Sequence, residues 1–561
     1  MYRNYELFGN AGLVIGTLFR AETRVTDDEF DYKKTQDVIE SGGRTLRDRY
    51  WGRYIAFIND VHRKRTIVIR DCSGAMRCYR MRLECVDILF SDINDLDVLP
   101  NCTFTINQSY LASFIAFSQL QIRECGLNEV TELLAGDAVN FQEDSVVQLS
   151  LWEPRRICEL ESIEDFESAA IALRTVTQSC VNSWSSSFKS ILLALSGGFD
   201  SSIVLGSLVR ARSVPAVTCV NYYSAHATDD ERQFARLAAQ HCSARLIEVQ
   251  RSSESAILTP ELLHEPRSTK PTVTSLFHLD ERSRISRLST EYDAESMWTG
   301  EGGDHLFLAM RTHLSANDYR CGHLFNLGLF SAVADAARLS RQPYVTVLRA
   351  LVKGTPARLA GSSSLPVELH REFLQEEAIS VGGFERHLNP WAASCEGLPP
   401  GKQYQIFYLA DILNRDRGIA GVDKGYQHHP LLSQPLIELC LRIPTYTLLK
   451  GGLQRSLARH AFECYAPKQI VARMDKGETT PYVADVIRER ESFVAELLLD
   501  GQLAQARIIR RAALEPYLRH RKTFRADQIS PLLACVAAEL WVRHWSRPGT
   551  AAAPQLRMPA S

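Results

Sequence analysis

The stretch ILLALSGGFDSSIVLGSL, residues 191–208, limits what this chain can fold into more than any other. Its apolar start is typical of a strand buried on both faces, and residues 201–211 predict the opening of a helix. Between them lies Ser196-Gly197-Gly198-Phe199-Asp200-Ser201. Glycines let a backbone approach an anion closely, and a helix N-terminus offers free amide groups and the positive end of a dipole. This pattern predicts a phosphate-binding loop.

The pattern along the chain changes near residue 160. Before it, short apolar runs broken by turns indicate a mostly antiparallel β domain with one or two helices. After it, buried-type runs alternate with helical windows, which indicates a parallel sheet covered on both faces, followed by a mainly helical part. We therefore predict an α+β domain at 1–158, an α/β domain at 159–545 and a disordered tail at 546–561.

Net charge, hydropathy and cysteine spacing disfavour several classes of protein. With 64 basic and 66 acidic residues the net charge is -2, so no global field attracts nucleic acid or an anionic membrane. No apolar run approaches the roughly 18 residues that a membrane span needs. The 14 cysteines are scattered singly, which favours reduced thiols over a disulfide framework. We expect a cytoplasmic protein with no membrane span and no nucleic-acid partner.

A second glycine cluster, Thr299-Gly300-Glu301-Gly302-Gly303-Asp304, also follows an apolar run. In a parallel sheet both loops emerge at the carboxyl ends of strands, where ligands bind. Asp200 and Asp304 are then expected to flank one site and share Mg²⁺ on bound phosphates, since Mg²⁺ prefers oxygen ligands. The chain has no G-x-x-x-x-G-K-[ST] motif, which disfavours transfer of a γ-phosphate.

These motifs resemble those of a known family. SGGFDSS is similar to the loop of ATP pyrophosphatases, and together with TGEGGDHLF it resembles the synthetase domain of asparagine synthetase and its relatives. Residues 50–80 resemble the glutaminase domain of the same family. The resemblance implies Ntn-hydrolase-like antiparallel sheets, then an adenine nucleotide alpha hydrolase-like domain that binds ATP.

One departure concerns the glutaminase. In this family the glutaminase nucleophile is a cysteine at residue 1, whereas this sequence begins with Met1-Tyr2-Arg3-Asn4 and its first cysteine is Cys72. Glutamine hydrolysis is therefore not expected, and the N-terminal domain is interpreted as a structural relic. Two groups of relatives fit a lost glutaminase: β-lactam synthetases and lasso peptide cyclases. Both activate a carboxylate as an acyl-adenylate and trap it with an amine of the same molecule.

The segments YQHHPLLSQP and RDCSGAMRCYR look more like those of lasso peptide cyclases. This resemblance implies adenylation of an Asp or Glu side chain of a precursor peptide and closure of an isopeptide bond, a macrolactam, with its N-terminal amine. ATP and Mg²⁺ would be required, with a leader peptidase and a leader-binding protein as companions. The alternatives are a β-lactam synthetase-like or ammonia-dependent ligase acting on a small carboxylate, and a non-catalytic scaffold.

The resemblance also assigns roles to residues. Glu301 is expected to handle the proton of the amine, although its carboxylate could merely brace the glycine turn. Lys476 is expected to stabilise the oxyanion, and Val220 and Asn221 to contact adenine. His428 and His429 are candidates for the substrate pocket, with simple packing as the alternative. Binding of ATP and pyrophosphate is assigned to Ser196, Gly197, Gly198, Asp200, Ser201, Ser202 and Gly300.

Overall fold

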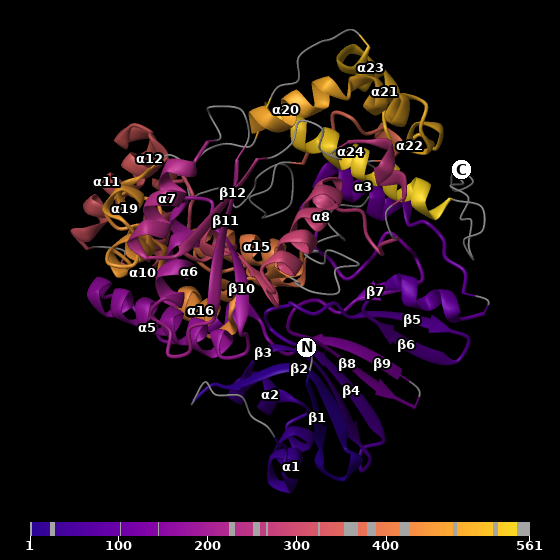
Figure 1. Cartoon of the computed structure of the whole chain (residues 1–561), viewed down its shortest axis with the longest axis horizontal. Coiled ribbons are helices and arrows are strands. Elements are labelled where there is room, and N and C mark those ends of the chain that lie inside the picture. Colours follow the sequence, from indigo (N-terminus) through magenta and orange to yellow (C-terminus); the bar gives the residue numbers. More distant parts are fainter. Residues whose placement is uncertain are drawn as a thin grey trace.

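The computed structural model of the chain describes residues 3–22, 29–100, 102–143, 145–223, 230–250, 258–264, 267–323, 326–352, 369–378, 389–415, 427–474, 480–519 and 526–546. Figure 1 shows the N-terminal sheets at one end of the molecule, a parallel sheet beside them, and the last helices at the opposite end.

The N-terminal part contains two antiparallel sheets, as the alternating apolar runs predict. The larger has the order β1 (Arg3–Leu7), β2 (Gly12–Arg20), β3 (Tyr50–Asp60), β4 (Arg65–Arg70), β8 (Asp137–Gln142) and β9 (Ser145–Ser150). The smaller has the order β6 (Val86–Phe90), β5 (Tyr79–Leu83) and β7 (Val130–Glu132). The accompanying helices are η1 (Phe8–Asn10), α1 (Tyr32–Glu40), α2 (Arg44–Arg49), η2 (Ile93–Val98) and α3 (Gln108–Ala116).

The second part is built on a parallel sheet, which confirms the α/β prediction. Its order is β12 (Arg245–Gln250), β11 (Ala216–Tyr223), β10 (Ser190–Ala194), β13 (Ser296–Trp298) and β14 (Gln427–His428). Parallel neighbours need crossover connections. These contain α6 (Phe199–Leu208), α7 (Arg232–His241) and α8 (Ser275–Glu291), while α5 (Phe166–Ser185) precedes β10.

Both faces of the parallel sheet are covered, which explains the continuous apolar run of β10. Ile191 and Leu193 pack in the large cluster that includes α5 and α6. Leu192 points to the other face and packs with Ile285 and Leu288 of α8. A strand that is buried on both faces has apolar residues at successive positions, without alternation of apolar and polar residues.

The remaining described elements are mainly helical. They are α4 (Pro154–Cys158), η4 (Pro260–His264), α9 (Gly303–Leu306), α10 (Leu314–Gly322), α11 (Gly328–Ser340), α12 (Tyr344–Val352), α14 (Pro390–Ser394), α15 (Pro400–Asn414), η5 (Pro430–Leu432), α16 (Gln434–Arg442), α17 (Thr445–Leu448), α18 (Ser456–Ala461), α19 (Lys468–Ala472), α20 (Thr480–Glu489), α21 (Glu491–Leu499), α22 (Gln502–Gln505), α23 (Arg511–Leu518) and α24 (Ala526–Trp545). Among the described residues no helix is long and apolar enough to span a bilayer. The predicted tail, apart from Ser546, lies outside the described residues.

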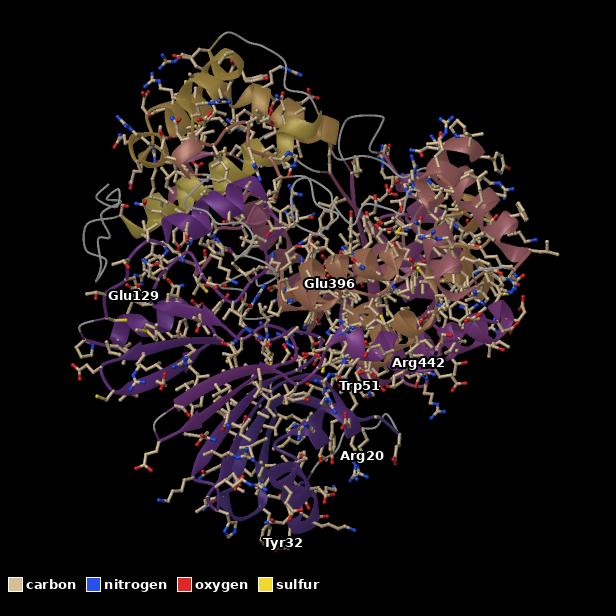
Figure 2. The ribbon with its side chains drawn as sticks, turned by 180° about the vertical axis from the view of Figure 1, so that it is seen from behind. Arg20, Tyr32, Trp51, Glu129, Glu396 and Arg442 are labelled. Carbon is tan, nitrogen blue, oxygen red and sulfur yellow. The ribbon has the colours of Figure 1, made fainter. Side chains whose placement is uncertain are left out.

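The two parts share hydrophobic cores. Phe19 of β2 and Trp51 of β3 meet Trp184 of α5, with ring centroids 4.8 Å and 5.8 Å from the indole of Trp184. Figure 2 shows Trp51 where the N-terminal sheets adjoin the C-terminal helices, and Tyr32 at the far end of those sheets. At another junction Phe104 packs against Trp545 of α24. The N-terminal part therefore packs directly against helices α5 and α24 of the C-terminal part.

Candidate active site

The two glycine loops lie side by side at the carboxyl edge of the parallel sheet. In the pairing of β10 with β13, Leu193 lies opposite Trp298, so the chain leaves both strands at the same level. A Cβ added to Gly300 would lie 2.4 Å from the backbone nitrogen of Ser201, and one added to Gly303 would lie 2.4 Å from Cγ of Asp200. Only glycine permits this close approach.

The loops form the wall of a cavity of about 390 Å³. Seven residues predicted from the sequence line it: Ser196, Gly198, Asp200, Ser201, Gly300, Glu301 and Asp304. Its other described lining residues are Ala194, Phe199, Thr299, Gly302, His305, Gln427, Arg455, Ile470 and Arg473.

Arg455 joins the two predicted aspartates, and the sequence did not identify it. Its Nη1 donates to Oδ2 of Asp200 at 2.9 Å and to Oδ1 of Asp304 at 2.7 Å. The side chains of Arg455 and Asp200 are 9% and 10% exposed, so this charge pair is largely removed from water. Arg455 precedes α18 with φ of 56°, a left-handed conformation that the tertiary structure must hold. The only local feature of the sequence near Arg455 is the Gly451-Gly452 pair, which predicts a turn shortly before it.

The donor set fits Mg²⁺. Both carboxylates approach one nitrogen atom of Arg455, so both can also approach one cation. Among the described residues no group of three or more His, Cys, Asp or Glu side chains could hold a metal. Two carboxylates suffice for Mg²⁺ when the phosphates of a nucleotide and water complete its octahedron.

The phosphate loop is held in shape by its own hydroxyls. The backbone nitrogen of Gly198 donates to Ser196 Oγ at 3.2 Å, and the hydroxyls of Ser201 and Ser202 donate to Gly198 O at 3.1 Å and 2.8 Å. Gly197 has φ of +81°, and a Cβ there would lie 2.8 Å from the carbonyl oxygen of Glu231. Gly197 and Ser202 therefore shape the loop, and neither belongs to the cavity wall.

A second cation, Arg473, lies on the cavity wall. Its Nη2 donates to Glu231 at 2.5 Å, and its guanidinium lies 4.0 Å from the ring centroid of Phe234. Both partners come from the start of α7 or the residue before it. Arg455 and Arg473 thus supply positive charge on the side of the cavity that α18 and α19 form.

Glu301 faces the cavity and contacts His429. The Nδ1 of His429 lies 3.2 Å from Glu301 Oε2 and 2.7 Å from the hydroxyl oxygen of Thr299. The backbone nitrogen of Glu301 donates to the same hydroxyl at 3.1 Å. The side chain of His429 is 7% exposed and that of Glu301 is 29% exposed. His429 therefore positions the carboxylate of Glu301 and does not itself line the cavity.

His428 is placed differently from its neighbour. Its ring packs between the indoles of Trp184 and Trp298, at centroid distances of 4.2 Å and 4.9 Å. Burial, with the positive charge of Arg53 and the nearby His429, lowers the pKa of His428 well below its ordinary value. A neutral, enclosed ring is a packing residue, and the structure gives His428 no contact with the cavity.

The two adenine candidates do not line the cavity either. Val220 is 1% exposed and packs on the α8 face of the sheet. Asn221 is also 1% exposed, and its Nδ2 donates to the carbonyl oxygen of Leu195 at 2.8 Å. The side chain of Val220 packs in the core and that of Asn221 is hydrogen-bonded to the backbone, so side-chain contact with adenine is not supported. Lys476 lies outside the described residues.

Comparison with known proteins places the chain in a family. Two solved structures are similar over part of their length: the U34-tRNA thiolase NcsA from Methanococcus maripaludis (14% identity, 46% of this chain and 84% of that chain, TM-score 0.21) and the glutamine-dependent NAD+ synthetase from Acinetobacter baumannii in complex with ADP (12%, 71% and 87%, 0.20). No curated protein matches. The family model described as asparagine synthase matches residues 172–543, which include both glycine loops, Arg455 and Arg473. The chain therefore belongs to the asparagine synthase family, whose members are ATP-dependent, AMP-forming ligases.

Proposed function

We propose that this protein is a lasso peptide cyclase. It would adenylate an Asp or Glu side chain of a precursor peptide and join it to the peptide's N-terminal amine. The observation that carries the proposal is the pair formed by Glu301 and His429 of the HHP segment, at the same cavity as the Asp200–Arg455–Asp304 cluster. Glu301 and residues of the Ser196–Ser202 loop line one cavity, which supports the proposed roles of a base and an anion-binding loop.

The first step is attack of the peptide carboxylate on the α-phosphorus of ATP, with pyrophosphate as the leaving group. The Ser196–Ser202 loop would hold the pyrophosphate through its backbone amides, at the start of α6. Arg455 and Arg473 would offset negative charge that develops on the phosphates. Asp200 and Asp304 would hold Mg²⁺, which would supply further charge neutralisation.

The second step is attack of the amine on the acyl-adenylate, with AMP as the leaving group. An ammonium ion has no lone pair, so the amine must lose a proton as it attacks. Glu301 would take this proton, and His429 and Thr299 would fix the direction of its carboxylate. Lys476 is the proposed partner of the oxyanion. Proton removal by a positioned group typically accelerates such a step about 10²- to 10⁴-fold.

Two buried thiols of the N-terminal part, Cys72 and Cys78, are poor candidates for a nucleophile that hydrolyses glutamine. Burial raises the pKa of Cys72 well above its ordinary value and the pKa of Cys78 to about 12. A thiol that stays protonated is a poor nucleophile. The companion leader peptidase and leader-binding protein remain part of the proposal.

The test is an assay of the purified chain with ATP, MgCl₂ and a precursor core peptide that has Gly, Ala or Ser at its start. We expect AMP, pyrophosphate and a peptide lighter by one water. Glu301→Gln should retain exchange of labelled pyrophosphate into ATP yet lose cyclisation, whereas Asp200→Asn should lose both. Glu40→Gln, an exposed substitution on α1, is the matched control.

Two outcomes would contradict the proposal. Formation of ADP instead of AMP would exclude adenylation. AMP formation driven by ammonium and aspartate, or by a small amino-carboxylate, in the absence of peptide would favour the asparagine-synthetase-like or β-lactam-synthetase-like alternative.

A further inference from the structure

A second cavity, of about 210 Å³, lies where the N-terminal part meets the helices of the C-terminal part. Its walls come from the start of β5, from α3 and the residues after it, from the segment before α8, from the C-terminal end of α15, and from α24. No residue is common to this wall and to the described wall of the first cavity. It is therefore a separate site.

The ionisable lining of the second cavity is mostly cationic. Among the described lining residues, Arg77, Lys270 and Arg415 are cationic and Asp411 is the one acid. Asp411 forms an ion pair with Arg415. The cavity thus presents positive charge in a region that the surrounding elements shield from water, where an anion is bound more strongly than at an open surface.

The carboxylate of Glu132 forms ion pairs with three cations, two of which line the cavity. Glu132 is fully buried and lies 2.6 Å from Lys270 Nζ, 2.6 Å from Arg77 Nη1 and 2.8 Å from Arg70 Nη1. Although burial raises the pKa of Glu132, the charges of Lys270, Arg77 and Arg70 outweigh it, and the pKa is lowered. Glu132 is therefore ionised, and its charge is divided among three partners.

Lys270 shows most clearly which kind of ligand is suited to the cavity. Its side chain is 8% exposed, and its Nζ donates to Glu132 and, at 2.5 Å, to the carbonyl oxygen of Ile122. An ammonium group has three donors. The described residues therefore supply acceptors for two of them, at a position that lines the cavity. Burial of a cation is costly unless an anion or hydrogen bonds compensate it.

Aromatic side chains share the cavity wall with these cations. Tyr79, Tyr110 and Phe114 line the cavity, so its wall offers contacts for an apolar group as well as for a charge. We propose that the second cavity binds a carboxylate carried on an apolar body, and that in the peptide substrate this is a second carboxylate, distinct from the one that is adenylated. The assignment to the peptide rests on the proposed function; the binding of a carboxylate does not.

The position of the cavity fits a substrate subsite. Arg415 lines the second cavity, and Gln427, twelve residues later in the sequence, lines the first. Burial lowers the pKa of Arg415, but the negative charges of Asp411 and Glu301 outweigh burial and raise it. Arg415 is thus within electrostatic range of the carboxylate that would accept the amine proton. We therefore expect a peptide anchored at Arg415 to extend toward Glu301.

The binding test uses phenylacetate, with phenylacetamide as its uncharged counterpart, in calorimetric titrations of the full-length chain. We expect phenylacetate to bind roughly tenfold more tightly, the effect of one hydrogen bond to a charged group. Lys270→Gln should abolish the difference. Two controls should retain it: Lys33→Gln, an exposed change on α1, and Arg473→Gln, which removes a cation from the first cavity.

A second variant separates binding from folding. Arg415 is more exposed than Lys270, at 28%, so Arg415→Gln is expected to fold and still weaken phenylacetate binding. Equal binding of the acid and the amide to the native chain would overturn the proposal. So would a Lys270→Gln or Arg415→Gln variant that binds phenylacetate as the native chain does, or loss of the preference in Arg473→Gln alone.

The source of the carboxylate is decided with peptides. Amidation of the C-terminus should raise KM about tenfold with kcat unchanged if the terminal carboxylate occupies the cavity. Replacement of acidic residues outside the ring by their amides should do so if a side chain occupies it. If neither change raises KM, the assignment to the peptide is wrong, and phenylacetate binding still reports whether the site takes a carboxylate.

Discussion

Arg455→Ala tests the centre of the candidate site, because one guanidinium holds the two aspartates at the cavity. A hydrogen bond to a charged partner contributes about 1.5–3 kcal/mol. The contact with Asp200 is buried, whereas Asp304 is 39% exposed, so solvent screens the second contact and its contribution is below about 1 kcal/mol. Loss of Arg455 also removes the positive charge that offsets the cost of burying the Asp200 carboxylate. We expect the free energy of unfolding to fall by roughly 3 kcal/mol.

The same variant reports on magnesium. Without the guanidinium, Asp200 and Asp304 face one another, and a divalent cation that binds between them will stabilise the folded chain by mass action. MgCl₂ should therefore raise the melting temperature of Arg455→Ala. The matched control is Arg65→Ala, because Arg65 binds the buried carboxylate of Asp60 at 3.0 Å in a sheet remote from the cavity.

The measurement is unfolding in urea, followed by tryptophan fluorescence, and thermal melting with and without MgCl₂. The reasoning is refuted if Arg455→Ala unfolds within about 0.5 kcal/mol of the native chain, the range of ordinary surface changes. It is also refuted if MgCl₂ stabilises Arg65→Ala as much as Arg455→Ala.

Three further predictions concern other parts of the molecule. His429→Ala should lower kcat about tenfold to a hundredfold with little change in KM, because Glu301 loses its brace; His429→Asn, whose amide can replace Nδ1, should recover part of this in a steady-state assay. Gly300→Ala should abolish pyrophosphate exchange while circular dichroism stays native, because its Cβ would press on the backbone of Ser201. Burial raises the pKa of Asp318 from 3.8 to about 6, so between about pH 4 and 6 the folded chain retains a proton that the unfolded chain releases. Stability should therefore fall by about 3 kcal/mol as pH rises through this range, and urea titrations of Asp318→Asn should lack that part of the fall. An equal pH slope in both proteins would contradict this.

The sequence by itself determined the features that depend on neighbours in the chain. An apolar run, a glycine loop and a helix start are local signals, so the phosphate loop, the second glycine cluster and the α/β class were predictable from residues 191–208 and 296–307. The expectation that both loops share a cavity followed because parallel neighbouring strands end at the same edge.

Only the tertiary structure decided which side chains complete the site. Arg455 is 255 residues from Asp200 in the sequence, and no periodicity connects them. His428 and His429 are adjacent and chemically identical, yet one is packed among tryptophans and the other contacts Glu301. Likewise the side-chain amide of Asn221 donates to the backbone carbonyl of Leu195, the residue that follows the neighbouring strand β10. The direction of a side chain and the identity of its partner are set by long-range packing, which local sequence does not encode.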